Sequence, residues 1–212
     1  MKKTETGFET FRFLADQARE AGASDARIIF SDRIIVEDRV RLKCRAGCPS
    51  YGKNLTCPPH APDVEDFRSC LKDYRIALLV KFTSPAYLDT SIRNCVLSSL
   101  FDPRSPPDQK EKALGFMKEL AKNSRHIHKI MLDLEKAAFN AGYPFALTMI
   151  CGACAQCETC NIATGFCKHP RLRRFNAEGL GINVVKTAAD AGMPIHFPAP
   201  DYPERIALLL ID

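Results

Sequence analysis

The feature that most constrains this chain is a cysteine run in its second half, ICGACAQCETCNIATGFCKHP, with the spacing C-x2-C-x2-C-x2-C-x6-C. A structural zinc site usually takes two ligands from each of two separated knuckles, because one tetrahedral ion needs only four convergent donors. Consecutive C-x2-C steps instead wrap one segment around a larger object, as in bacterial ferredoxins, whose C-x2-C-x2-C run binds a 4Fe–4S cluster. We therefore expect a 4Fe–4S cluster, with zinc as the alternative. The candidate ligands are Cys151, Cys154, Cys157, Cys160 and Cys167.

The cellular compartment decides whether such thiols bind metal or form disulfides. The chain has 212 residues and ten cysteines, and disulfides would persist only in an oxidising compartment. The N-terminal sequence MKKTETGFETFRF has two lysines but no apolar stretch after them, so it predicts no secretory signal. No apolar run approaches the roughly 20 residues that cross a bilayer, so no membrane association is expected. We expect a cytoplasmic protein whose reduced cysteines bind metal.

A second cysteine group lies upstream, in KCRAGCPSYGKNLTCPP. Its C-x3-C-x8-C spacing supplies three thiolates, one fewer than a 4Fe–4S cluster requires. Together the two groups contain eight cysteines, which is the number that two such clusters need. The partition with the shortest loops assigns Cys154, Cys157, Cys160 and Cys167 to one cluster, and Cys44, Cys48, Cys57 and Cys151 to the other.

Two other partitions stay open and lead to different functions. A ferredoxin-like arrangement would join Cys151, Cys154 and Cys157 to a distant fourth ligand. Alternatively, the upstream cluster has only three cysteines and one open iron. Closed clusters indicate an electron carrier or redox module for a partner enzyme. An open iron near Tyr51 or His60 could bind a substrate and would indicate an enzyme, and a third alternative is a zinc-stabilised interaction module.

Other cysteines and histidines are expected to play supporting roles. Cys70 lies on the apolar face of a predicted helix, which indicates a buried structural thiol. His60 and His169 adjoin the cysteine groups and are expected to support ligands rather than bind metal. His126 and His128 fall on the polar side of a long predicted helix, where we expect them to be solvated.

The chain carries a formal net charge of +5, and basic residues flank both cysteine groups. An oxidised cluster with four thiolates carries a charge of about −2, so these residues would compensate it. They could also form a docking patch for an acidic redox partner protein. No nucleic-acid-binding motif accompanies them, so no nucleic-acid partner is expected. The residues are Arg41, Lys43, Arg45 and Lys53 near the first group, and Lys168, Arg171, Arg173 and Arg174 after the second.

Apolar periodicity predicts an α/β fold, a layered sheet with flanking helices and two cysteine-rich metal-binding loops. Strands are predicted at residues 27–30, 33–42, 75–82, 145–150 and 205–211, and helices at 8–21, 63–74, 114–141 and 184–191. We expect one domain over residues 1–212. The proline-rich segment FDPRSPPDQ, residues 101–109, is the candidate for an internal boundary.

Two sets of short motifs follow one another along the chain. The front set is Lys43-Cys44, Cys48-Pro49, Tyr51-Gly52 and Cys57-Pro58-Pro59. The back set is Cys154-x2-Cys157-x2-Cys160, Cys167-x-His169-Pro170 and EGLGINV at residues 178–184. This order resembles a family of predicted metal-binding, cysteine-rich proteins of unknown function that is common in anaerobic bacteria and archaea. The resemblance extends from about residue 25 to the C-terminus and implies metal binding without a reaction, and Cys151 lies outside the family pattern.

Overall fold

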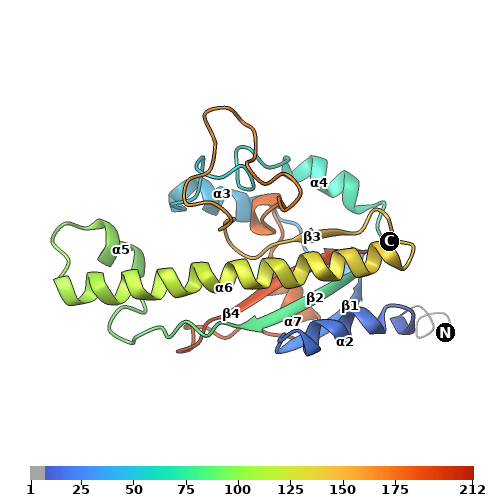
Figure 1. Cartoon of the computed structure of the whole chain (residues 1–212), viewed down its shortest axis with the longest axis horizontal. Coiled ribbons are helices and arrows are strands. Elements are labelled where there is room, and N and C mark those ends of the chain that lie inside the picture. The colour runs from blue at the N-terminus through green and yellow to red at the C-terminus, as the bar shows by residue number, and fades with distance from the viewer. Residues whose placement is uncertain (1–7) are drawn as a thin grey trace.

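A computed structural model describes residues 8–212 of the chain, with a four-stranded sheet at its centre (Figure 1). The strands are β1 (Asp25–Phe30), β2 (Ile76–Thr83), β3 (Leu147–Met149) and β4 (Glu204–Leu210). Their order in the sheet is β1-β2-β4-β3, and every pairing is antiparallel. The predicted α/β fold is therefore confirmed, as a layered arrangement built on an antiparallel sheet.

The two central strands, β2 and β4, are covered on both faces. Five consecutive residues are buried at the start of β2 and at the end of β4, where Leu79 pairs with Leu208. A strand that contacts apolar layers on both sides needs apolar residues at every position. This burial explains the continuous apolar runs IALLV and IALLL in the sequence.

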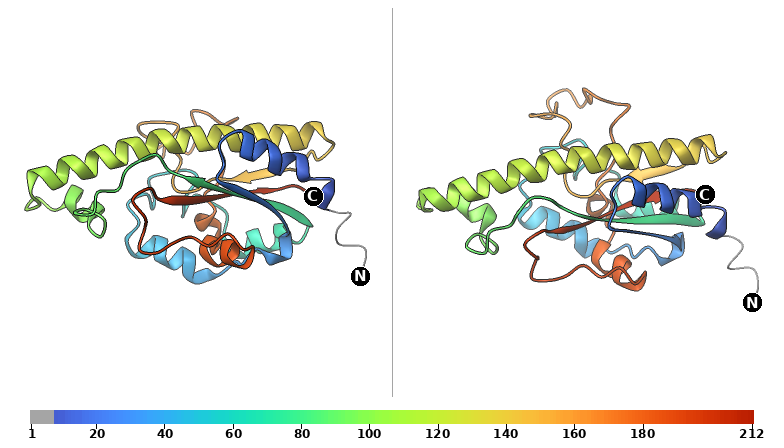
Figure 2. Two further views of the ribbon diagram at one scale, coloured as in Figure 1. Left: turned by 90° about the horizontal axis from the view of Figure 1, so that it is seen from below. Right: turned by 60° about the horizontal axis from the view of Figure 1, so that its bottom comes forward.

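Helices cover both faces of the sheet (Figure 2). The helices α2 (Arg12–Glu20) and α6 (Pro107–Asn140) cover one face, where Leu14 and Leu134 are buried with Leu78 and Leu209. On the other face, Phe67 of α4 (Val64–Leu71) and Ala188 of α7 (Val184–Asp190) belong to a second core cluster. The 3₁₀ helix η2 (Glu178–Leu180) contributes Leu180 to that second cluster.

The N-terminal half of α6 extends beyond the sheet and packs against α5 (Val96–Phe101) through a separate small cluster that contains Ile92 and Phe116. The predicted boundary at residues 101–109 falls between these two helices. Strands from both sides of it form one sheet. The single-domain assignment stays a prediction. Among residues 8–212, no helix combines the length and the apolar character that a membrane crossing requires.

The predicted strand at residues 33–42 is wrong. Residues Ser31–Arg33 form the 3₁₀ helix η1, and Asp38–Gly47 form helix α3, which contains Cys44. The segment DRVRLKCRAG is rich in good helix formers, and only Val36 forms a bridge, with Ile182. Without a neighbouring strand to pair with, local helix propensity determined the structure beyond Val36.

Two expectations about burial are also wrong. Cys70 is exposed, because α4 buries only Val64 and Phe67 and turns its thiol outward. His128 is only 2% exposed, whereas His126 is exposed as expected. The sequence pattern did not reveal that the polar side of α6 is covered near Leu172, in the segment that follows the cysteine run.

Candidate metal centre

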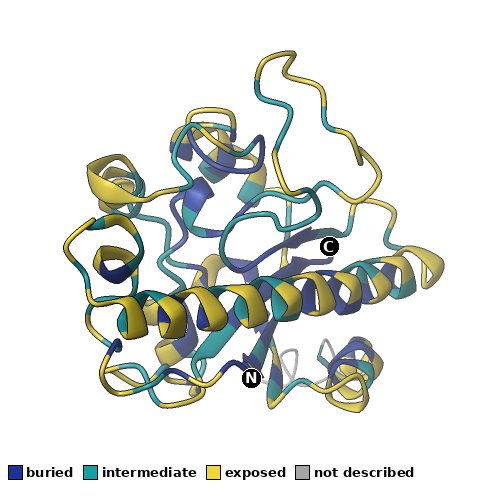
Figure 3. Ribbon diagram, turned by 60° about the vertical axis from the view of Figure 1, so that its left-hand side comes forward, coloured by how far each residue is buried: buried dark blue, intermediate teal, exposed yellow. Residues whose placement is uncertain are grey.

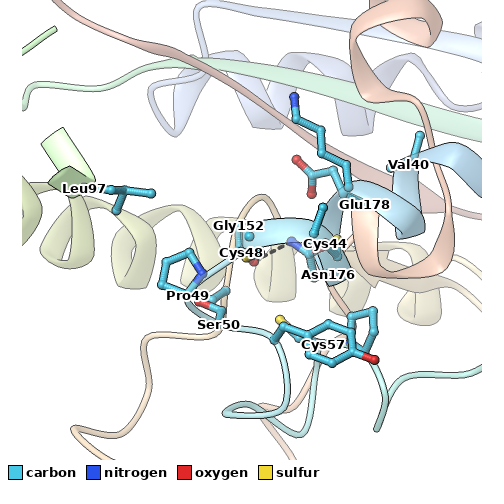
Figure 4. A pocket seen from close by; sticks show the side chains of 16 residues that line it. Val40, Cys44, Cys48, Pro49, Ser50, Cys57, Leu97, Gly152, Asn176 and Glu178 are labelled. Carbon is cyan, nitrogen blue, oxygen red and sulfur yellow. Dashed lines mark hydrogen bonds between the residues drawn. The ribbon is translucent and has the colours of Figure 1, made fainter. Parts of the chain in front are cut away.

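The three upstream cysteines line one cavity of about 640 Å³, which we call the upstream cavity (Figure 4). Cys44 lies on α3, Cys48 directly follows this helix, and Cys57 lies in the next loop. Gly152 and Glu178, which come from later in the chain, complete the wall together with Ala153 and Asn176. With Leu97 of α5, the cavity thus combines three cysteines with groups from three distant segments.

Four downstream cysteines line a second void of about 20 Å³, which we call the downstream cavity. Its cysteines are Cys154, Cys157, Cys160 and Cys167. The upstream loop supplies part of the wall through Leu55 and Thr56, and Arg173 closes another side. This set of cysteines is the one that the preferred partition assigns to a single cluster.

The two cavities are neighbours that share both cysteine loops. Thr56 lines the downstream cavity and the next residue, Cys57, lines the upstream one. In the other loop, Ala153 lines the upstream cavity and Cys154 the downstream one. Because consecutive Cα atoms are about 3.8 Å apart, only one thickness of chain separates the cavities at these points.

Asn176 connects the segments that build both cavities. Its side-chain amide donates to the carbonyl oxygen of Gly152 at 2.7 Å, and its Oδ1 accepts from the Gly179 N–H at 2.6 Å. Its own backbone N–H donates to the carbonyl of Thr56 at 3.1 Å. Asn176 is only 6% exposed, so these hydrogen bonds satisfy groups that water does not reach.

Helix α3 is held in place at its N-terminus by Glu37. The Glu37 N–H donates to the carbonyl of Gly181 at 2.8 Å, and its carboxylate accepts from Asn183 and Lys186 at 2.8 and 2.9 Å. Hydrogen bonds from Arg39, Asn183 and Lys186 lower the pKa of Glu37 to about 2. Glu37 therefore fixes the start of the helix that presents Cys44 relative to the segment that contains Glu178.

Burial makes several of the thiols reluctant to ionise. It raises the pKa of Cys57 to about 12, and it also raises the pKa values of Cys44 and Cys154. A metal ligand must be a thiolate, so metal binding would release protons from these groups. The thiol groups are thus charged at neutral pH only if a cation stabilises them.

Two cysteine sulfurs of the downstream cavity accept backbone hydrogen bonds. The Leu55 N–H donates to Cys160 Sγ at 3.4 Å, and the His169 N–H donates to Cys167 Sγ at 3.3 Å. Such bonds stabilise negative charge on sulfur and tune the potential of iron–sulfur clusters. His169 contributes its backbone to the site, and its exposed ring agrees with a supporting role.

Basic residues distribute unevenly around the cavities. Lys43 lines the upstream cavity, and Lys168 and Arg173 line the downstream one. Arg173 also donates to the Leu55 carbonyl at 2.8 Å, which joins the two cysteine loops. Arg174 instead pairs with Glu135 of α6, away from the thiols. Only part of the basic set can therefore compensate the charge of a bound metal centre.

Cys151 lies apart from the other downstream cysteines. It is 8% exposed, belongs to the core cluster beneath α2 and α6, and lines neither cavity. Its carbonyl oxygen accepts from Arg205 Nη2 at 2.7 Å. The structure thus does not bring Cys151 together with Cys44, Cys48 and Cys57, and its role as a ligand stays a prediction.

Glu178 is the site residue that sequence reasoning missed. Its carboxylate lines the upstream cavity, and burial raises its pKa, which the amides of Asn176 and Gly152 offset only in part. The one signal in the sequence was its place in EGLGINV, a motif of the family resemblance. No spacing rule connects a single glutamate with cysteines so far away in the chain.

The donor chemistry of the cavities fits a metal that prefers sulfur, because thiolates select zinc and iron–sulfur clusters. Among residues 8–212, however, no three Cys, His, Asp or Glu side chains are positioned as a metal ion would need them. Segment 152–172 has no helix, strand or buried residue and projects from the molecule (Figure 3). Binding of a single metal ion would therefore draw the cysteines of this segment together. Binding of a cluster would draw them around a larger group.

Residues 27–211 match the family described as predicted metal-binding protein (DUF2284), and the chain belongs to this family. The match covers most of the chain and includes every cysteine of both groups. No curated protein matches the chain. No solved structure matches it either. The comparisons thus indicate metal binding and leave the metal and the reaction to be inferred from the site.

Proposed function

We propose that this member of the family is an iron–sulfur protein that serves as an electron carrier or redox module for a partner enzyme. One 4Fe–4S cluster would be held by Cys154, Cys157, Cys160 and Cys167, and a second by the upstream cavity. The observation that supports this most is the shared wall of the two cavities, where Thr56 lines the downstream cavity and the next residue, Cys57, lines the upstream one. A cluster of this kind supplies one-electron chemistry when bound.

The arrangement of the two cavities suits electron transfer through the protein. The downstream loop is exposed, and its cationic residues Lys168 and Arg171 are exposed with it. Only one thickness of chain separates the upstream cavity from the downstream one. An electron would therefore enter from an acidic partner docked on the downstream loop and pass to the upstream centre.

An enzyme is the second candidate, and the size of the upstream cavity supports it. Cavities that bind small molecules measure about 300–1,000 Å³, and the upstream cavity falls within this range. Val40, Pro49 and Leu97 supply apolar parts of its wall. Three cysteines would leave one iron without a thiolate, and the remaining space could admit a small substrate there.

A zinc-stabilised interaction module is the third candidate. The downstream cavity, at about 20 Å³, has room for about one water-sized group as it stands. A single zinc ion would need smaller movements of the cysteines than a cube of iron and sulfur. Electron transfer would then be excluded at this site, because zinc does not change its oxidation state.

Electron paramagnetic resonance of the anaerobically purified, dithionite-reduced protein tests the proposal. Two reduced clusters in neighbouring cavities should couple magnetically and give a broadened, complex spectrum. The Cys160→Ala variant should give the simple spectrum of one isolated cluster. A wild-type spectrum that is the sum of two uncoupled signals would contradict the neighbouring arrangement. Bound zinc without any cluster signal would contradict the redox function.

A further inference from the structure

Glu178 lines the upstream cavity together with the three cysteines (Figure 4). Its Oε2 is inaccessible to solvent and makes no hydrogen bond to any residue between 8 and 212. A buried carboxylate oxygen without a partner is costly, because it loses its water shell and gains nothing in exchange. Such a group in a cavity lined by thiols points to a positively charged ligand.

The polar groups nearest to Glu178 act on its carboxylate but leave Oε2 without a hydrogen bond, and they also bind other partners. The side-chain amide of Asn176 donates to Gly152. Arg205, the cation that acts on the carboxylate, donates to Ser124 Oγ and to the Cys151 carbonyl, both at 2.7 Å. Among residues 8–212, Oε2 is therefore left without a direct hydrogen-bond partner.

The position of Glu178 is fixed by its backbone. Its carbonyl accepts from the Gly181 N–H at 3.0 Å, and the preceding turn is closed by the Asn176–Gly179 hydrogen bond. A Cβ atom at Gly179 would lie 3.2 Å from Cδ of Pro58, so a side chain there would require η2 and the Cys57 loop to move apart by a few tenths of an ångström. The carboxylate is thus held against the loop that presents Cys57.

We propose that Glu178 is the fourth protein ligand of the metal centre in the upstream cavity, beside Cys44, Cys48 and Cys57. The proposal rests on the proposed function and assigns to Glu178 the position that the sequence offered to Cys151. Carboxylate oxygen is an established ligand of zinc and of iron. One carboxylate and three thiolates carry the same charge as four thiolates.

The unequal ligand sets give the two centres different chemistry. A carboxylate is a harder ligand than a thiolate and binds a thiophilic metal less firmly. The upstream centre would therefore have one position at which a small exogenous donor can replace the protein ligand, whereas the downstream centre would be closed by four cysteines. The upstream cavity, at about 640 Å³, has room for such a donor.

Variants of Glu178 in the full-length chain test the assignment. A Cys160→Ala background removes the downstream centre, so that only the upstream metal is observed. In this background, Glu178→Gln should accelerate metal loss to a chelator about 10- to 100-fold and shift the spectrum of the reduced centre. Glu178→Cys should restore retention with a spectrum typical of four thiolates. Glu204→Gln, which removes a paired carboxylate remote from both cavities, is the matched control and should leave both unchanged.

The possible outcomes separate this proposal from the proposed function. Unchanged metal retention and spectra in both Glu178 variants would overturn the ligand assignment while the cluster stays in place. The ligand assignment would also be overturned if the upstream cavity bound no metal in the Cys160→Ala background. If the centre holds zinc, the redox function fails, and zinc retention in the same variants still decides the role of Glu178. The Glu178→Cys variant also shows that a loss in Glu178→Gln does not reflect misfolding.

Discussion

The side-chain amide of Asn176 donates a 2.7 Å hydrogen bond to the carbonyl oxygen of Gly152. The same side chain accepts from Gly179, and the Asn176 backbone donates to Thr56. One buried residue therefore connects the upstream cysteine loop, the start of the downstream cysteine run and the turn that presents Glu178. The proximity of the two cavities depends on this connection.

Replacing Asn176 with alanine should destabilise the protein and weaken metal binding at both centres. The carbonyl of Gly152 and the N–H of Gly179 would lose their partners in a buried environment, which costs about 1–3 kcal/mol. Urea unfolding measures the loss, and metal analysis after dialysis reports on both centres. The exposed Asn140→Ala variant should lose no more than about 0.5 kcal/mol. An Asn176→Ala variant as stable as wild type would refute the connecting role.

Single cysteine substitutions should divide the thiols into two classes, those that lower the iron content and those that leave it unchanged. Cys160→Ala and Cys44→Ala should each lower the iron content by about four atoms per chain, because each removes a ligand of one cluster. The exposed Cys70→Ala should leave the iron content unchanged. Cys151→Ala should also leave it unchanged, because Cys151 lines neither cavity. If Cys151→Ala loses as much iron as Cys44→Ala, the eight-cysteine partition holds instead.

Substituting Gly152 should disturb the junction between the cavities. Gly152 has φ +72°, and a Cβ atom there would lie 3.1 Å from Arg205 Nη2, so Gly152→Ala should cost about 1–2 kcal/mol. Gly115 is an exposed glycine in α6 with no heavy atom within 4 Å of an added Cβ. Gly115→Ala should therefore stabilise the helix by about 0.5–1 kcal/mol. Urea midpoints that move in the same direction for both variants would contradict the structure.

The stability of the metal-free protein should fall as the pH drops below about 6.5. Burial, the largest cause, and the charge of Arg174 lower the pKa of His128 from its usual 6.5, against the opposing effects of a hydrogen bond with the Leu172 backbone and of the charge of Glu135. His128 therefore binds a proton more readily in the unfolded chain than in the folded one. Its contribution to folding stability is present above pH 6.5 and is lost as the pH falls. Urea unfolding at pH 7.5 and at pH 5.5 gives the free energy of unfolding at each pH. This free energy should decrease less between the two pH values for His128→Gln than for wild type. The exposed His126→Gln should behave as wild type, and equal decreases in all three proteins would exclude His128 as the source.

The sequence predicted the parts of the fold whose burial is continuous or strictly periodic. The strands β2 and β4 and the helix α6 fall close to their predicted positions, because their apolar residues report directly on the core. Residues 33–42, part of which lie in α3, were predicted as a strand because Ile34, Val36 and Val40 follow a partly alternating pattern. The structure of this segment depends on the absence of a neighbouring strand beyond Val36, which local sequence does not reveal.

The candidate site was predictable only where cysteine spacing encodes it. The run from Cys154 to Cys167 indicated one site, and its members line one cavity. Glu178 has no such spacing, and Cys151 has a spacing that continues the run while its side chain packs in the core. Which side chains face the upstream cavity follows from the Asn176 turn and the Ile150–Asn176 bridge, and these are tertiary features.

The most direct test of the central claim is the content of iron and acid-labile sulfide in the anaerobically purified wild-type protein. The proposed function predicts about eight atoms of each per chain, as two 4Fe–4S clusters require. Four of each would mean that only one cavity is filled, and the Cys44 and Cys160 variants would identify it. Stoichiometric zinc with no sulfide would contradict the proposal.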